Sequence, residues 1–158
     1  MSKNSYKEQY AWFIQLCQNE FQFIIDDYNF SNVLTDMNGY EIDIIYRRDE
    51  DTDTNIKRVG VGIHWEVPMV IPNISFTLSE GSIKKPKVKK YSIFKLIQER
   101  CPELSPIRII MGNNEVRSVA EKGILTQEEV ILIIRNYVKI IKMYGTNILN
   151  GDFTDLEN

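Results

Sequence analysis

The dipeptide Asn38-Gly39 constrains the fold more than any other feature of this sequence, because it lies between two runs of β-prone residues. Asn-Gly tolerates the positive φ angles of a tight type I′ turn, so runs 33–37 and 40–47 are expected to form a β-hairpin. Apolar residues alternate with polar ones in the second run, the apolar set being Ile42, Ile44 and Tyr46. This alternation predicts one buried and one solvated face, as in an antiparallel sheet.

Two later runs show the same alternation and predict two more strands. The apolar positions are Val59, Val61, Ile63 and Trp65 in one run, and Ile74, Phe76 and Leu78 in the other. Pro68 and Pro72 fall between the runs and predict a loop or a sheet edge there, because proline cannot donate to a strand ladder. Residues 79–90, rich in lysine, are expected to form a connecting loop.

Helical periodicity dominates both ends of the chain. Apolar residues recur every three or four positions over residues 6–28, which predicts an N-terminal helix. Ser92 is a candidate cap for a short helix to Arg100, stopped by Pro102, and another short helix is expected at 114–122.

The last helix opens with the capping box Thr126-Gln-Glu-Glu129 and is expected to continue to Leu149, with Gly151 in the left-handed position beyond its end. The predicted fold is a single α+β domain over residues 1–158. An N-terminal helix precedes an antiparallel meander of about four strands. Helices follow the meander, and the long final one packs on one face of the sheet.

Composition limits the classes of protein that this chain can belong to. With 43% hydrophobic and 26% charged residues it resembles globular domains, so disorder is not expected. No run of about 20 apolar residues is present, and no apolar signal segment follows the first charges, so we expect a cytoplasmic protein without a membrane partner. Cys17 and Cys101 lie in apolar helical surroundings and are interpreted as core residues.

The sequence contains few candidates for metal or nucleophilic chemistry. The segment Asp49–Asn55 has the alternating oxygens of a calcium loop, but it lacks the turn glycine and the closing glutamate at the required spacing. It is interpreted as a solvated loop, with an acidic docking patch as the alternative. His64 is the only histidine and falls on the exposed phase of its strand, so neither a metal ligand nor a cofactor is predicted.

Two charged groups remain as alternatives. Glu41 and Asp43 share one face of a strand, where they either decorate a wet surface or act as an acid–base pair in a pocket. The lysines of the Lys84–Lys90 run either lie in a solvated loop or bind a small molecule or a nucleic acid. With a net charge of −3, a nucleic-acid partner is not favoured and a basic partner is.

Two phrases of the sequence resemble a known class of protein. The first is Phe21-Gln-Phe-Ile-Ile-Asp-Asp-Tyr-Asn-Phe30, and the second runs from Asn136 to Ile148-Leu-Asn-Gly-Asp-Phe153. Together they are similar to small bacterial immunity proteins of polymorphic toxin systems, or to uncharacterised families of the same architecture. In those proteins an N-terminal helix precedes a strand meander, and a long helix closes the fold.

The resemblance implies a non-enzymatic function. The protein would bind a cognate toxin domain, which is a basic nuclease in many such systems, and cover its active site without catalysis or a cofactor. Acidic side chains would speed encounter with a basic partner. The residues expected to bind it are Asp49, Glu50, Asp51 and Asp53, followed by Glu41 and Asp43.

Overall fold

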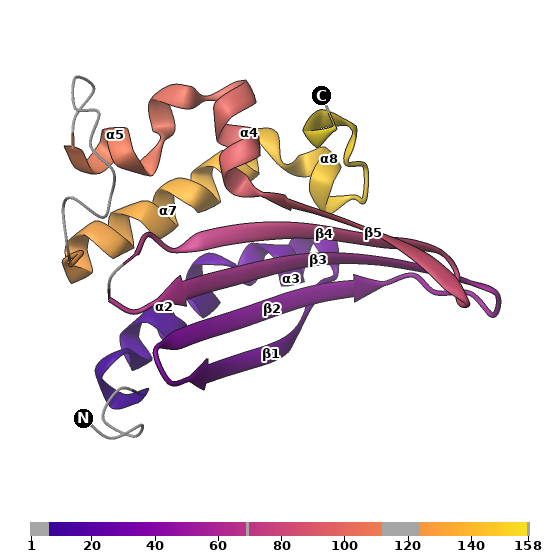
Figure 1. Cartoon of the computed structure of the whole chain (residues 1–158), viewed down its shortest axis with the longest axis horizontal. Coiled ribbons are helices and arrows are strands. Elements are labelled where there is room, and N and C mark those ends of the chain that lie inside the picture. Colours follow the sequence, from indigo (N-terminus) through magenta and orange to yellow (C-terminus); the bar gives the residue numbers. More distant parts are fainter. Residues whose placement is uncertain (1–6, 69, 112–123, 158) are drawn as a thin grey trace.

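The centre of the fold is a five-stranded antiparallel sheet whose strands follow one another in chain order (Figure 1). A computed structural model describes residues 7–68, 70–111 and 124–157. The predicted α+β meander is confirmed, with one strand more than expected. The strands are β1 (Ser31–Asn38), β2 (Glu41–Asp49), β3 (Asn55–Glu66), β4 (Asn73–Ser82) and β5 (Lys85–Ser92).

The β1–β2 hairpin is confirmed, but its turn differs from the predicted type. Asn38 still pairs with Glu41, so the loop consists of Gly39 and Tyr40. Gly39 has a φ of 65°, whereas Asn38 has no positive φ. Glycine at the first loop position is the pattern of a type II′ turn, which also matches the twist of the flanking strands.

The fifth strand replaces part of the loop predicted at residues 79–90. β4 extends to Ser82, and β5 pairs with it in the register Ser79 opposite Val88. The lysines concealed this strand, because lysine is depleted in strands on average. At the edge of a sheet, lysine is well tolerated and discourages pairing with another chain.

The N-terminal helical region is interrupted, contrary to the prediction of one helix over residues 6–28. Residues 7–9 are helical and Tyr10 forms a turn, after which come α2 (Ala11–Glu20) and α3 (Gln22–Tyr28). Phe21, between α2 and α3, is fully buried. The apolar periodicity continues through the break, so the sequence pattern alone could not locate it. Asn29 ends α3 in the left-handed conformation, with a φ of 60°.

The middle helices agree with the capping signals. Ser92 caps α4 (Ile93–Arg100) by accepting a hydrogen bond from the backbone N–H of Phe94. The short elements η1 (Pro102–Leu104) and α5 (Pro106–Met111) follow. The helix predicted at 114–122 lies outside the described residues.

The capping box at Thr126 and Glu129 is confirmed at the start of α7 (Gln127–Tyr144). α7 ends earlier than predicted, at Gly145, where an added Cβ would lie 2.7 Å from the carbonyl oxygen of Ile141. Two short elements then follow, α8 (Thr146–Leu149) and η2 (Thr154–Leu156). Gly151 adopts the predicted left-handed conformation, with a φ of 88°.

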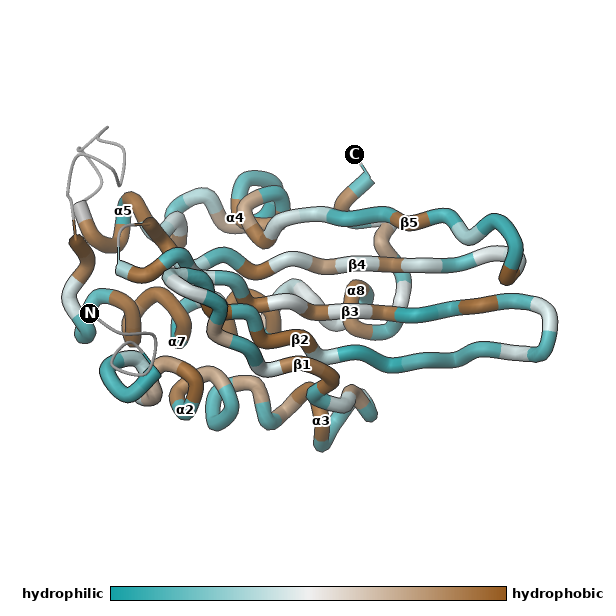
Figure 2. Tube along the Cα trace, turned by 60° about the horizontal axis from the view of Figure 1, so that its bottom comes forward, coloured by the Kyte–Doolittle hydropathy of each residue, from teal (hydrophilic) through white to brown (hydrophobic). Residues whose placement is uncertain are grey.

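The helices pack on one face of the sheet and bury its apolar residues. The ring of Trp65 lies 4.7 Å from that of Phe13 between centroids, and the buried Tyr137 hydroxyl donates to the carbonyl of Pro72 at 2.6 Å. Figure 2 shows that the β2–β3 hairpin becomes hydrophilic toward its tip, away from the helices. Cys17 and Cys101 are both buried and unbridged, as predicted. No helix in the described part of the chain has the length and apolarity needed to cross a membrane.

Candidate functional site

The face of the sheet opposite the buried one carries polar and small side chains and is called here the open face. Glycines occupy its middle on β3, and their β4 neighbours lean over them. A Cβ at Gly60 would lie 2.3 Å from Thr77 Oγ1, and a Cβ at Gly62 would lie 2.9 Å from Ser75 Oγ. The centre of the open face is therefore low, and the hydroxyl groups of Thr77 and Ser75 cover the glycine backbone there.

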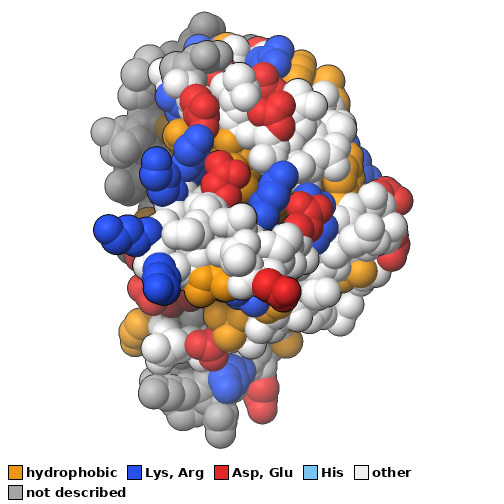
Figure 3. All heavy atoms as spheres, turned by 90° about the vertical axis from the view of Figure 1, so that its right-hand side faces the viewer, with side chains coloured by type: hydrophobic (Ala, Val, Ile, Leu, Met, Phe, Trp, Pro, Cys, Tyr) orange, Lys and Arg blue, Asp and Glu red, His pale blue; other side chains and the backbone are white. Residues whose placement is uncertain are grey.

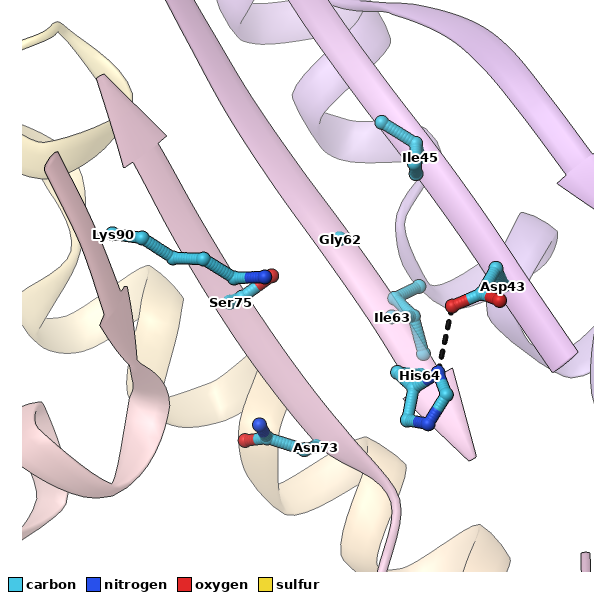
Figure 4. Close-up of a pocket in the computed structure, with 8 residues that line it drawn as sticks. All are labelled: Asp43, Ile45, Gly62, Ile63, His64, Asn73, Ser75 and Lys90. Atoms are coloured by element: carbon cyan, nitrogen blue, oxygen red, sulfur yellow. Dashed lines mark hydrogen bonds and ion pairs between the residues drawn. The ribbon is translucent and has the colours of Figure 1, made fainter. Parts of the chain in front are cut away.

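A hollow of about 320 Å³ lies in this low region (Figure 4). Asp43 and His64 stand on one side of it, and Lys90 reaches in from β5 on the other side, toward Ser75. Gly62 and Ile45 lie between the two sides. The hollow is thus negatively charged at one end and positively charged at the other.

Four carboxylates gather beside the negative end of the hollow. They are called here the acidic corner and are Asp36, Glu41, Asp43 and Glu66. The strand register sets Asp36 opposite Asp43 and Glu41 opposite Glu66. No lysine or arginine in the described part of the chain forms an ion pair with any of the four. Like charges directly opposite one another on neighbouring strands repel, so a positive charge placed at this corner would be stabilised.

Among the described residues, His64 is the one basic side chain that contacts the acidic corner. Its Nδ1 lies 2.7 Å from Asp43 Oδ1, and its Nε2 lies 3.8 Å from Glu66 Oε1. An ionised carboxylate can only accept hydrogen bonds, so Nδ1 is the donor to Asp43. The imidazole is held by β3 and by this bond, while about 41% of its side chain remains exposed. Its predicted position on the sheet surface is confirmed.

The carboxylates at the far end of the same face are paired. Arg47 binds both oxygens of Asp49, at 2.7 and 3.0 Å, and Arg58 binds Asp51 at 2.8 Å. The hydrogen bond from Arg58 lowers the pKa of Asp51, and Asp51 in turn raises the pKa of Arg58. Figure 3 views this end of the molecule and shows acidic and basic side chains interleaved across it.

Glu50 extends this second group to the side of the sheet that the helices cover, where its partners Arg48 and Lys57 lie. The whole group is called here the ion-paired end (residues 47–51, 57 and 58). Its carboxylate lies 3.3 Å from Arg48 and 3.9 Å from Lys57. Arg48 is also tied to the core, because it donates to the carbonyl of Tyr28 at 2.8 Å. Opposite charges therefore compensate this end within the chain.

The structure separates the residues that the sequence grouped as one acidic candidate surface. Asp49, Glu50 and Asp51 belong to the ion-paired end, and Asp53 is exposed in the loop beyond it. Glu41 and Asp43 belong to the acidic corner, where neither is enclosed in a deep pocket. Sequence reasoning missed Asp36 and Glu66. The predicted Asn38-Gly39 turn would have placed Asp36 opposite Glu41, so the observed pairing with Asp43 depends on the loop being Gly39-Tyr40. The position of Glu66 depends on the β2–β3 register.

The lysine run does not form a single surface. Along β5 its members alternate between the two sides of the sheet, so that Lys90 lines the hollow while Lys89 pairs with Glu157 near the C-terminal end. This hydrogen bond to Glu157 raises the pKa of Lys89. The interpretation of the run as one phosphate-binding patch therefore loses its geometric basis.

The two phrases that resemble immunity proteins have packing roles in this structure. Phe21 and Phe30 are buried at the two ends of α3, and Phe153 is buried with its ring 6.2 Å from that of Tyr91. In comparisons with family models, curated proteins and solved structures, nothing matches this chain.

Proposed function

We propose that this protein is an immunity-type inhibitor that binds a basic toxin domain in the cytoplasm through its open sheet face, without catalysis. The observation that carries the proposal is the acidic corner, four carboxylates without a lysine or arginine partner in the described part of the chain. A cationic protein surface would supply the missing positive charge. The resemblance at both ends of the chain supplies the class of partner.

The form of the open face supports docking by a protein. The carboxylates stand on three neighbouring strands of one sheet, so their spacing is fixed before binding and little order has to be gained. The adjoining hollow has acceptors on Asp43, Asn73 and Ser75 within reach of an inserted lysine or arginine. Lys90 at its other side would fix the orientation, because it repels a cation placed there.

Charge complementarity of this kind acts mainly on the rate of encounter and on the choice of partner. We therefore expect association to slow as salt is raised, since exposed charges are screened over roughly 8–10 Å at physiological ionic strength. The ion-paired end contributes little to such steering, because its charges cancel over short distances.

The test is co-expression with the toxin domain encoded beside this gene, scored by cell growth and by isolation of a one-to-one complex. The double variant Glu41→Lys/Glu66→Lys should bind at least about tenfold more weakly, because charge complementarity is reversed. Asp53→Lys, with one reversal outside the acidic corner, is the matched control and should change affinity less than about twofold. Absence of both complex and protection contradicts the proposed function. If the double variant binds the toxin domain with unchanged affinity, that result contradicts the docking surface but not the proposed function.

A further inference from the structure

Three potential metal ligands converge at the edge of the acidic corner. One oxygen of Glu41, one of Glu66 and a ring nitrogen of His64 all lie within 4.8 Å of one another. Ligand atoms around a tetrahedral zinc ion lie about 3.3 Å apart, so modest rotations of the two flexible glutamates would close the set. All three side chains come from paired positions on β2 and β3, a rigid scaffold.

The imidazole distinguishes this group from a cluster that is merely acidic. Asp43 accepts the Nδ1 proton at 2.7 Å, which leaves Nε2 as the nitrogen whose lone pair faces Glu66. A carboxylate that holds the far nitrogen of a ligating histidine is the usual outer partner in protein metal sites, where it fixes the tautomer and makes the ligand more basic. Asp43 has this position before any ion binds.

The electrostatics of the group also favour a cation. Glu41 and Glu66 stand directly opposite each other, and the lone pair of a neutral imidazole would point into the same space. These three groups repel one another unless positive charge lies between them. A divalent ion would relieve that repulsion and use every donor present.

We propose that Glu41, His64 and Glu66 form a binding site for a divalent transition metal ion of the zinc class, with Asp43 as the residue that positions His64. Imidazole with carboxylates suits Zn²⁺, Co²⁺ and Ni²⁺ better than Mg²⁺, which prefers oxygen ligands and retains its water. Three protein ligands leave at least one coordination position open to solvent. The site goes beyond toxin binding and does not depend on it.

The experiment uses tag-free, chelator-treated protein and titrates it with ZnCl2 in a calorimeter, with MgCl2 as the comparison. We expect one Zn²⁺ per chain and no heat from Mg²⁺. Because the chain has a single histidine, its one set of imidazole NMR signals must shift with the same midpoint. Co²⁺ should add visible absorption bands typical of a nitrogen- and oxygen-ligated site.

Four single variants separate ligation from simple charge attraction. H64Q should abolish one-to-one binding, and E66Q should weaken it at least tenfold. D43N should weaken it about tenfold, at the lower end of the range for outer partners. The matched control is D36N, which removes the same charge from the same corner without removing a ligand or its partner, and it should change affinity less than threefold.

All four side chains are on the open face, so circular dichroism and an urea-unfolding midpoint will establish that each variant is folded before it is titrated. Unchanged binding in H64Q would overturn the metal site, as would equal losses in E66Q and D36N. Because the readout is metal binding by the free protein, failure here leaves the toxin complex standing. Failure of that complex likewise leaves this result standing.

Discussion

The acidic corner and the ion-paired end lie at opposite ends of the sheet, and their carboxylates differ in whether an arginine or lysine pairs with them. At the ion-paired end, Asp49 and Asp51 are each bound by an arginine within 3.0 Å. At the acidic corner, Asp36 and Glu41 have no such partner in the described part of the chain. Acidic residues that are adjacent in sequence are thus neutralised within one hairpin. Those that the sheet gathers from three strands have no lysine or arginine partner among the described residues, and His64 contacts two of them.

The comparison teaches that a run of charge in a sequence is a poor guide to an available charged surface. The loop at 49–53 has the highest density of acidic residues, yet three of its carboxylates are already engaged. An engaged carboxylate has lost much of its capacity to attract a new partner. The acidic corner, which no sequence window shows, retains that capacity.

The largest expected effect on stability comes from removing the buried Trp65 ring, which packs beneath the acidic corner. Trp65 lies between His64 and Glu66 with its ring in the core, so Trp65→Ala should lower the free energy of unfolding by about 3–5 kcal/mol, as measured with urea. Amide exchange in native conditions should accelerate at residues 63–66 more than at 56–60. Equal acceleration at the two ends would show that they are not independently supported.

The second prediction reverses one charge at each end and compares the sign of the resulting change in the free energy of unfolding. Glu66→Lys places a cation opposite Glu41 and should stabilise the fold by about 0.2–1 kcal/mol. Arg58→Glu faces Asp51 with a like charge and should destabilise it. Urea-unfolding midpoints measure both changes. If Glu66→Lys destabilises the fold, the contrast between the two ends is wrong, because the carboxylates of the acidic corner would then not repel one another.

Elements that depend on contacts between residues close in sequence were predicted correctly, and those that depend on contacts between distant residues were not. The β1–β2 hairpin and both helix caps were predictable, because Gly39, Ser92 and Thr126 act on residues within three or four positions. The break at Phe21 was not, because it depends on how that ring packs against Tyr46, 6.3 Å away between centroids.

The candidate site was predicted only in part, for the same reason. Glu41 and Asp43 were identified from the alternation within one strand. Their relation to Glu66 and His64 requires the β2–β3 register, and the intervening polar loop does not specify that register. β5 was missed because average propensities describe lysine as unfavourable in strands, whereas an edge strand accepts it.

A third prediction concerns acid and the ion-paired end. Because Arg58 lowers the pKa of Asp51 below its ordinary value of 3.8, this carboxylate stabilises the fold fully above that value. The contribution is lost as the pH falls through the lowered pKa. Between about pH 5 and pH 3, the wild type should therefore lose more stability than Asp51→Asn, as followed by thermal unfolding. Parallel curves for the two proteins would contradict the pairing in solution.

The smallest expected effect is that of salt. Raising NaCl from roughly 0.02 to 0.5 M shortens the screening length to a few ångströms and should diminish the stabilising effect of Glu66→Lys. A buried change such as Trp65→Ala should keep its effect, because it does not depend on surface charge. Persistence of the Glu66→Lys gain at high salt would assign it to packing rather than to relief of repulsion.

The burial of Cys17 and Cys101 has a practical consequence for such experiments. Burial raises the pKa of both thiols, so neither is expected to react with maleimide while the protein is folded. A cysteine introduced at Asp53 or Asp36 would then accept a fluorescent label selectively, without removal of the native pair. Two singly labelled proteins, one with the label at each end of the sheet, would then show at which end a partner binds.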